Sequence, residues 1–208
     1  MKNNYCKICF KEINKYSMHS LVFKDSLICE SCFNNFKPKF IHFRIGTIKG
    51  LSIYEYDENI KNLLYTFKGT YDIELKDVFL DRYFWYLRLI YKGFYLVPVP
   101  SFHLEDDKRG FNHVVEIYNR LKLPMLKIID KTEDVKQAKQ RKKDRLNAIK
   151  RFKINDTSIV KDKKILVVDD VYTTGSSVKA VIDLVRQGKP KKIAVLVVAK
   201  NIEKTTYT

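Results

Sequence analysis

Residues 165–177 read ILVVDDVYTTGSS, and this segment constrains the fold of the chain more than any other. Its first residues, Ile165 to Val168, are all aliphatic, which is typical of a strand buried on both faces of a parallel sheet. Asp169 and Asp170 then interrupt the apolar run. Because carboxylates are costly to bury without partners, we expect the strand to end there, at the edge where ligands bind in open α/β sheets.

A turn rich in hydroxyl groups follows the two carboxylates and opens a helix. The first backbone N–H groups of a helix lack intrahelical acceptors and lie at the positive end of its dipole, so they can hold a phosphate. Ordinary helix capping is the alternative, but it requires neither paired carboxylates nor a run of five such residues. We therefore predict a sugar-phosphate site that includes Thr173, Thr174, Gly175, Ser176 and Ser177.

The segment resembles the motif with which type I phosphoribosyltransferases bind 5-phosphoribosyl 1-pyrophosphate (PRPP). In that motif a hydrophobic strand is followed by two acidic residues and a turn of Thr, Gly and Ser. The resemblance implies that Asp169 and Asp170 hold the ribose 2′- and 3′-hydroxyls and that residues 172–177 hold the 5′-phosphate. The implied PRPP-binding residues are Asp169, Asp170, Val171, Tyr172, Thr173, Thr174, Gly175, Ser176 and Ser177.

The composition is that of a globular chain with an excess of positive charge. With 208 residues, 45% of them hydrophobic, the chain can bury one full core. Its formal charge of +16 favours polyanions such as PRPP, pyrophosphate or nucleic acid, although a general bias toward lysine would give the same value. The N-terminus shows no signal-peptide pattern, and no apolar run approaches the ~20 residues of a membrane span. We expect a cytoplasmic protein without membrane insertion.

All four cysteines lie near the N-terminus, as Cys6, Cys9, Cys29 and Cys32. The spacing C-x2-C-x19-C-x2-C lets each pair turn two thiolates toward one tetrahedral ion. Disulfides are the alternative, which a reducing cytosol disfavours. Because four sulfur ligands leave no open coordination position, we predict a structural Zn²⁺ in a four-cysteine zinc ribbon over residues 1–40.

The rest of the chain alternates between strand and helix patterns. Apolar runs predict further strands at 47–56, 94–99, 125–129 and 193–199, and helical spacing predicts helices after Asp57 and at about 73–92, 112–121 and 175–188. This alternation is typical of an α/β fold with a mainly parallel sheet and helices on both faces. Phe84, Trp85 and Tyr86 lie among other apolar residues, so we expect them to pack in the core.

A second loop follows the strand at 94–99. The two prolines of VPVP at 97–100 predict a rigid loop, and Lys108 and Arg109 follow within a few residues. In a parallel sheet this loop would reach the edge that holds Asp169, where the planar guanidinium of Arg109 suits a phosphate. We predict pyrophosphate binding by Val99, Pro100, Ser101 and Arg109; Lys131 resembles a position that contacts pyrophosphate in related transferases.

The order of the motifs is similar to that of the ComF family of competence proteins, which joins a four-cysteine ribbon to a phosphoribosyltransferase-like domain. The matching residues are Lys68-Gly69, VPVP at 97–100, RGFN at 109–112, Gln137, Arg145, Asn147, and DDVYTTG at 169–175. The departures are a missing spacer before Gly69, His113 in place of Gln, and a one-residue deletion between Arg145 and Phe152. The resemblance implies a type I phosphoribosyltransferase fold over residues 41–208, with a small hood around 46–92.

Residues 136–151 carry eight Lys or Arg against one acid. Phosphoribosyltransferases keep a mobile loop in this position, so the resemblance implies a segment that closes over pyrophosphate. A solvated helix or a nucleic-acid patch is the alternative. If the segment is a nucleic-acid patch, its contacts would be Arg141, Lys142, Lys143 and Arg145.

The ComF resemblance implies a PRPP-binding protein that acts in DNA uptake and contacts single-stranded DNA, with other competence proteins as partners. As an enzyme it would displace pyrophosphate from C1 of ribose, with Mg²⁺ as cofactor and Asp169, Asp170 and Arg109 in catalysis. The acceptor is not evident from the sequence. A nucleobase phosphoribosyltransferase of salvage metabolism and a non-catalytic PRPP sensor are the alternatives.

Overall fold

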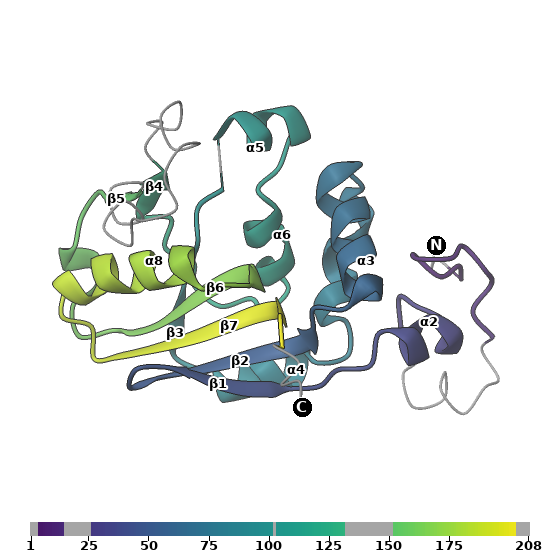
Figure 1. The fold of residues 1–208 in the computed structure, drawn as a ribbon, viewed down its shortest axis with the longest axis horizontal. Coiled ribbons are helices and arrows are strands. Elements are labelled where there is room, and N and C mark those ends of the chain that lie inside the picture. The colour runs from purple at the N-terminus through teal and green to yellow at the C-terminus, as the bar shows by residue number, and fades with distance from the viewer. Residues whose placement is uncertain (1–3, 15–25, 102, 132–151, 203–208) are drawn as a thin grey trace, which may run out of the picture.

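A five-stranded sheet forms the centre of the computed structural model, which describes residues 4–14, 26–101, 103–131 and 152–202 (Figure 1). The strand order is β1-β2-β7-β6-β3, and all neighbours are parallel except β1 and β2. Sheet and helices together confirm the predicted α/β class. The strands are β1 (Ile41–Ile45), β2 (Ile48–Glu55), β3 (Phe94–Pro98), β6 (Lys164–Tyr172) and β7 (Lys192–Lys200), and β4 (Ile129–Lys131) pairs with β5 (Phe152–Ile154) in a separate small sheet.

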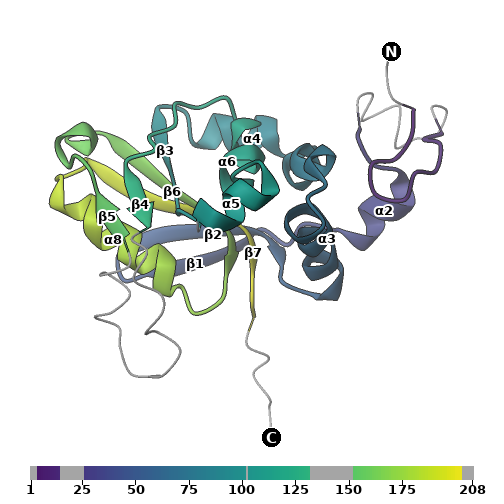
Figure 2. The same ribbon diagram turned by 90° about the horizontal axis from the view of Figure 1, so that it is seen from above.

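Helices cover both faces of the sheet (Figure 2). One face packs against α8 (Ser176–Gln187), whose buried residues join Ile165 and Val167 of β6 in one apolar cluster. The other face packs against several helices, whose apolar residues form a second cluster with Leu166 and Val168. These are α3 (Glu58–Gly69), the 3-10 helix η1 (Ile73–Leu80), α4 (Phe84–Ile90) and α6 (His113–Asn119); α2 (Glu30–Asn35), α5 (His103–Arg109) and η2 (Ser158–Val160) complete the described elements.

Local signals predicted α3 and α6 correctly. Asp57 caps α3 by accepting the N–H of Ile60, and the residues buried from this helix are spaced three and four apart. Asn112 caps α6 in the same way, by accepting the N–H of Val115. The helix predicted at 175–188 is also confirmed as α8.

The prediction of one helix over 73–92 is wrong. The chain forms η1, turns at residues 81–83 and begins again as α4. At the turn, the buried carboxylate of Asp81 accepts the backbone N–H of Leu27 at 3.0 Å and lies 3.4 Å from Arg120 Nη2. These partners are far from Asp81 in the sequence, so a local pattern could not reveal the break.

The expected core position of Trp85 and Tyr86 is wrong as well. Trp85 is 67% exposed and Tyr86 is 55% exposed, whereas Leu87 is the buried residue of α4. Phe84 is half-buried and packs against the core, as expected. Periodicity showed that this helix is apolar, but it could not show that one apolar side is left uncovered.

The sheet differs from the prediction at three other places. The short edge strand β1 was not predicted; it alternates between half-buried and exposed residues. The strand predicted at 125–129 is reduced to a single bridge between Met125 and Leu96, after which the chain enters β4. Finally, β6 does not end at Val168 but continues to Tyr172, because β7 pairs with it as far as Lys200.

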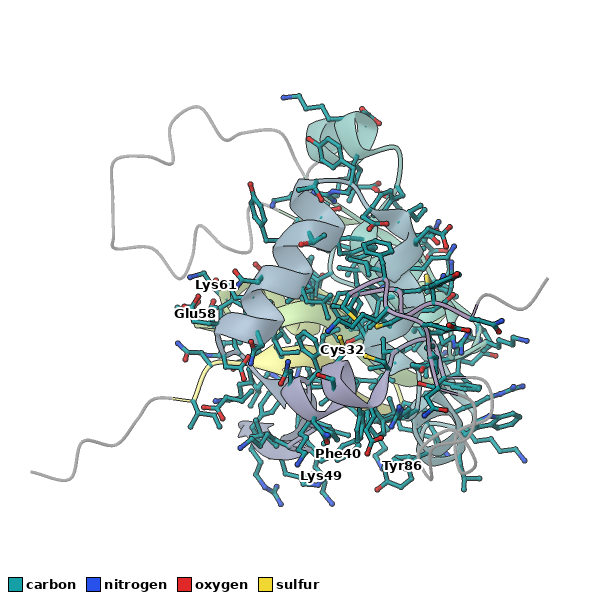
Figure 3. The ribbon with its side chains drawn as sticks, turned by 90° about the vertical axis from the view of Figure 1, so that its right-hand side faces the viewer. Cys32, Phe40, Lys49, Glu58, Lys61 and Tyr86 are labelled. Atoms are coloured by element: carbon teal, nitrogen blue, oxygen red, sulfur yellow. The ribbon has the colours of Figure 1, made fainter. Side chains whose placement is uncertain are left out.

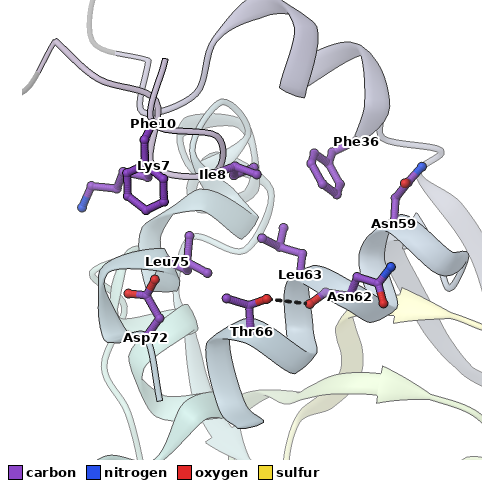
Figure 4. A pocket seen from close by; sticks show the side chains of 10 residues that line it. All are labelled: Lys7, Ile8, Phe10, Phe36, Asn59, Asn62, Leu63, Thr66, Asp72 and Leu75. Atoms are coloured by element: carbon purple, nitrogen blue, oxygen red, sulfur yellow. Dashed lines mark hydrogen bonds between the residues drawn. The ribbon is translucent and has the colours of Figure 1, made fainter. Parts of the chain in front are cut away.

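The N-terminal segment packs against the helical side of the sheet. Cys6, Ile28 and Cys32 belong to the same apolar cluster as α3 and η1, and Lys7 forms a 2.8 Å ion pair with Glu74. A surface hollow of about 210 Å³ lies between this segment and α3 (Figure 4). The division at residue 40 and the hood at 46–92 stay predictions; the structure places β2, part of the expected hood, inside the main sheet.

Among the described helices, none combines the length and the apolar character needed to cross a membrane.

Candidate functional site

Asp169 and Asp170 lie where the sheet loses one of its strands. The pairing of β6 with β3 ends at Val168, whose carbonyl accepts the N–H of Val99, while the pairing with β7 continues on the other side. The two carboxylates therefore occupy the carboxyl end of a central strand beside the loop that leaves β3. This is the position of ligand sites in open α/β sheets.

The side chain of Asp170 is buried and fully engaged. Its Oδ2 atom accepts a hydrogen bond from Lys68 Nζ at 2.6 Å and lies 3.3 Å from His113 Nε2. Its Oδ1 atom accepts the backbone N–H of Val171 at 2.7 Å. Asp170 thus joins β6 to both α3 and α6.

Arg109 closes this arrangement into a ring of four residues. Its Nε atom donates to the carbonyl oxygen of Lys68 at 3.0 Å, and its Nη1 atom lies 2.9 Å from His113 Nδ1. Because a guanidinium can only donate, His113 Nδ1 accepts, which leaves the ring proton on Nε2, facing Asp170. We call Lys68, Arg109, His113 and Asp170 the ionic ring.

The two carboxyl groups have opposite electrostatic situations. Burial raises the pKa of Asp169 well above 3.8, and the charge of Asp170 adds to this rise. Burial also acts to raise the pKa of Asp170, but the hydrogen bond from His113 and the charge of Lys68 outweigh it and hold that pKa below 3.8. Asp170 is therefore the stable carboxylate of the pair, and ionised Asp169 is the one that would gain from a ligand.

Asp169 is half-buried and has few protein partners. Its Oδ1 atom accepts the N–H of Asp170 at 2.9 Å. Its backbone carbonyl accepts a hydrogen bond from the Tyr118 hydroxyl at 2.9 Å, which holds this part of β6 in place. The side chain of Asp170 faces the α6 side, where it meets His113.

The turn after β6 exposes hydroxyl groups at the start of α8. Thr173, Thr174 and Ser176 are exposed, and Gly175 is the N-cap with φ of 70° and no side-chain cap. Thr174 Oγ1 donates to Ser176 Oγ at 3.2 Å and accepts the Ser176 N–H at 3.4 Å. Ser177 is half-buried in the first turn of the helix. N–H groups at a helix start beside exposed hydroxyls are the arrangement that binds phosphate.

Two residues of the expected PRPP segment pack inward instead. The ring of Tyr172 is buried, lies 4.7 Å from the ring of Phe43 and contacts Gly175, and burial raises the pKa of its hydroxyl. Val171 is half-buried against the helical cluster. Their contribution to a ligand is therefore restricted to backbone groups or to shaping the turn.

Replacing Gly175 with alanine is expected to lower the free energy of unfolding by about 2 kcal/mol or more. The left-handed φ alone costs a residue with Cβ ~1–2 kcal/mol, and the new Cβ would also overlap the Tyr172 ring. Gly46 is the matched control, since its φ is 58° and nothing lies within 4 Å of its virtual Cβ. Urea denaturation should show a larger loss for Gly175→Ala than for Gly46→Ala; equal losses would contradict a close packing of Tyr172 on the turn.

The loop after β3 is organised by Asp106. This carboxylate accepts hydrogen bonds from Ser101 Oγ, from Asn112 Nδ2 at 2.7 Å and from Arg109 Nη1 at 3.1 Å. Arg109 is consequently only 6% exposed, within the ionic ring rather than extended toward open solvent. Its assignment to pyrophosphate stays a prediction, as do those of Val99, which is buried, and Pro100, which is half-buried.

Lys131 ends β4, half-buried, with its ammonium 5.9 Å from the ring centre of Phe152. The predicted nucleic-acid contacts Arg141, Lys142, Lys143 and Arg145, together with Gln137 and Asn147, lie outside the described residues.

The four cysteines meet at one point, as their spacing predicted. Their sulfur atoms all lie within 4.8 Å of one another, and all four are free thiols. Cys6 and Cys9 flank a turn, whereas Cys29 caps α2 and Cys32 lies in its first turn. Tetrahedral zinc with bonds of ~2.3 Å would space its sulfurs ~3.8 Å apart. The 3.6 Å between Cys9 and Cys29 fits that spacing.

The thiols also differ in acidity. Burial raises the pKa of Cys29 and Cys32. At Cys9 the effect of burial is outweighed by hydrogen bonds, foremost one with the backbone of Lys11, and the pKa falls to about 7. Four converging thiols with one already acidic near neutral pH can bind a metal such as zinc.

Sequence reasoning did not assign a site role to Lys68, His113, Asp106 or Tyr118. Lys68 is 102 residues from Asp170, so only the tertiary fold brings them together. For His113 the sequence offered one indication of a special role, because this residue stands where the ComF family usually has Gln.

Comparison with known proteins agrees with this geometry. Residues 107–206 match the family model described as phosphoribosyl transferase domain. The chain is 29% identical over 146 residues to competence protein ComFC of Bacillus subtilis (strain 168), covering 69% of this chain and 60% of that protein. It is 27% identical over 142 residues to competence protein ComFC of Streptococcus pneumoniae (strain ATCC BAA-255 / R6), covering 68% and 64%. These similarities support a relation to the ComF-like phosphoribosyltransferase family.

The match to these ComF relatives spans less than two thirds of their length. Among solved structures, the chain is similar to a hypoxanthine phosphoribosyltransferase from Staphylococcus aureus, with 13% identity, a TM-score of 0.37 and coverage of 63% of this chain and 69% of that one. It is also similar to a purine phosphoribosyltransferase from Pyrococcus horikoshii Ot3, with 21% identity, a TM-score of 0.36 and coverage of 59% and 74%.

Proposed function

We propose that this protein binds PRPP with Mg²⁺ at the carboxyl end of β6 and acts in DNA uptake, where it contacts single-stranded DNA. The observation that supports PRPP most is the sequence of a poorly partnered carboxylate, Asp169, followed by exposed hydroxyls and an uncapped helix start. The role in DNA uptake rests on the similarity to the two competence proteins. A cytoplasmic location and partners among other competence proteins belong to the same proposal.

The two carboxylates have different tasks in this proposal. Asp169 accepts hydrogen bonds from the ribose hydroxyls, and the N–H groups and hydroxyls of residues 173–177 hold the 5′-phosphate. Asp170 keeps β6, α3 and α6 in place through the ionic ring and meets the ligand less directly. Mg²⁺ prefers oxygen ligands and is commonly held by one or two carboxylates together with substrate phosphates, and Asp169 supplies a suitable carboxylate.

Turnover is the second part of the proposal. The bound sugar would lose pyrophosphate from C1 through a cationic transition state, which the nearby carboxylates stabilise electrostatically. Arg109 contributes here by holding Lys68 and His113 in position. A salvage phosphoribosyltransferase and a PRPP sensor without turnover use the same binding site. Pyrophosphate release across a panel of nucleobases separates them, since only a salvage enzyme releases it with a base as acceptor.

Replacing Asp169 with asparagine is expected to abolish measurable heat of PRPP and Mg²⁺ binding in isothermal titration. An amide can still accept one hydrogen bond but carries no charge for the ribose hydroxyls or the metal. Asp183→Asn on the exposed side of α8 is the matched control and should bind like the wild type. Equal heats for Asp169→Asn and the wild type would refute the site.

The role in DNA uptake needs a test in the cell. Deletion of the chromosomal copy should abolish natural transformation, and the wild-type sequence should restore it. If the Asp169→Asn variant restores transformation fully while failing to bind PRPP, the sugar phosphate is not needed for uptake.

A further inference from the structure

The exposed side of α4 is an apolar feature that the proposed site does not use. Trp85, Tyr86, Leu89 and Ile90 are between 44% and 73% exposed, although the helix has only seven residues. Large exposed apolar patches on a soluble protein mark interaction sites. Two of these four side chains are aromatic, which gives the patch flat surfaces for stacking.

A groove continues this patch onto the sheet. It has a volume of about 220 Å³ and is lined by Tyr86 and Ile90 of α4, by Phe40, and by Lys49 and Lys192 at the amino ends of β2 and β7. The rings of Phe40 and Tyr86 meet edge to face at 5.9 Å. Figure 3 shows Phe40, Lys49 and Tyr86 side by side at the lower edge of the molecule.

A row of cations crosses four strands beside the groove. Arg44 of β1 lies directly opposite Lys49 of β2, and Lys164 of β6 lies directly opposite Lys192 of β7. Lys49 is opposite Ala194, so Lys192 is its diagonal neighbour on the same face. The ammonium groups of Lys164 and Lys192 lie 6.0 and 5.8 Å from the ring centre of Phe94.

This cation row has no counter-charge in the part of the chain that the structure describes. Neither Arg44, Lys49, Lys164 nor Lys192 takes part in any of the ion pairs formed there, and no Asp or Glu lines the groove. Like charges directly opposite on a sheet destabilise it. An anion bound along the row would relieve this repulsion.

We infer that α4, the groove and the cation row together form a binding surface for single-stranded DNA, with Trp85 and Tyr86 stacking on bases and the row contacting phosphates. Proteins that bind single strands combine an electropositive groove with exposed aromatic rings. The inference rests on the proposed contact with DNA and assigns it to a surface at the amino ends of the strands, opposite the end that holds Asp169.

Other occupants fit the surface less well. A two-fold dimer through this patch would bring two cation rows together. A small-molecule ligand is disfavoured because the groove is smaller than the ~300–1,000 Å³ of most ligand pockets, and because Trp85 is not among the residues that line it. An anionic membrane surface would satisfy the charges but would not need a groove between helix and sheet.

Trp85 makes the test direct, because it is the only tryptophan of the chain. Adding oligothymidylate to the wild type should quench tryptophan fluorescence, and the quenching should weaken steeply as salt increases. Duplex DNA, whose bases are already stacked, should quench less. PRPP with Mg²⁺ should leave the fluorescence unchanged, because its proposed site lies at the other end of the sheet.

Substitutions on the proposed surface test whether it binds the DNA, with affinity measured by fluorescence anisotropy of labelled oligothymidylate. Trp85→Ala with Tyr86→Ala should weaken binding roughly tenfold or more, since stacking contributes ~1–3 kcal/mol per base. Tyr65→Ala is the aromatic control, because Tyr65 is 66% exposed on α3. In a plot of the logarithm of affinity against the logarithm of salt concentration, Lys49→Gln and Lys192→Gln should each reduce the slope by ~1. Lys61→Gln on α3 should not change it.

The outcomes separate the inference from the proposed function. If the wild type does not bind oligothymidylate at all, the DNA contact in the proposed function fails together with this surface. If it binds and the aromatic and lysine variants bind equally well, only the surface assignment fails. Two further results would overturn it: a concentration-dependent dimer that Trp85→Ala abolishes, or a fluorescence change with anionic phosphatidylglycerol vesicles but not with oligothymidylate.

Discussion

Replacing Asp170 with asparagine is expected to lower the free energy of unfolding by about 3 kcal/mol, whereas the same change at Asp169 is expected to leave it unchanged or raise it. Removing one partner of a buried ion pair typically costs ~3–5 kcal/mol, and the lower value applies because Lys68 is partly exposed and can regain water. At Asp169 the raised pKa means that the charged form is disfavoured in the folded state. A neutral amide removes that cost. The residue proposed to bind the ligand is therefore the one whose charge lowers the stability of the folded protein.

A double-mutant cycle tests the ionic ring. Asp170→Asn and Lys68→Met should together cost less than the sum of the single changes, because both remove the same 2.6 Å contact. Asp183→Asn, whose partner Arg186 is exposed, should cost little. Strictly additive losses in urea denaturation, or a larger loss at Asp169 than at Asp170, would contradict the division of roles.

The same carboxylate sets a pH dependence with a defined sign. Because the pKa of Asp170 in the folded protein lies below 3.8, its contribution to stability is present above that value and is lost as the pH falls further. Asp169 has a raised pKa, so its charged form destabilises the folded state, and this destabilisation disappears as the pH falls and the carboxyl group is protonated. Acid unfolding of Asp170→Asn should therefore lack the loss of stability that the wild type shows below pH ~4.

Replacing Cys32 with serine is expected to release the metal and unfold the N-terminal segment while leaving the sheet intact. The binding of structural zinc contributes ~10–16 kcal/mol in zinc-finger peptides, far more than the hydrogen bonds that connect this segment to the rest. Hydrogen exchange should lose protection in residues 4–14 and 26–36 and keep it in β6 and β7. The protection of η1 should fall partly, since Asp81 loses its bond with Leu27.

Metal analysis and thiol counting check this prediction on the wild type. The purified protein should contain one equivalent of zinc, and a chelator in denaturant should expose four reactive thiols. Adding zinc back to the chelated wild type should restore protection, but it should not do so for Cys32→Ser. Fewer than four thiols would support disulfides, and a Cys32→Ser variant that keeps its zinc and its protection would rule out this set of ligands.

Features set by neighbouring residues were predictable from the sequence. The strand before Asp169 and the caps of α3 and α6 depend on residues within a few positions of each other, and the structure contains all of them. The cysteine cluster followed from spacing and metal chemistry. The caps depend on hydrogen bonds within a few residues, and the cysteine cluster follows the known tetrahedral coordination of zinc by sulfur.

Features set by distant residues were not predictable. The break at Asp81 depends on Leu27, and the partner of Asp170 comes from α3. The binding of pyrophosphate by Arg109 stays a prediction, but the hydrogen bond from its Nε atom to the Lys68 carbonyl, 41 residues away, could not be read from the local motif. The exposure of Trp85 likewise depends on which elements cover α4, and hydrophobic periodicity carries no information about that.

The proposed PRPP site and the proposed DNA surface lie at opposite ends of β6, and this separation limits how far one ligand can influence the other. Lys164 and Asp170 are six residues apart on one extended strand, a distance of ~20 Å at ~3.3 Å per residue. Electrostatic interactions through solvent decay over ~8 Å at physiological ionic strength, so charge bound at one end scarcely alters affinity at the other. Both ligands can therefore occupy one molecule with additive binding free energies.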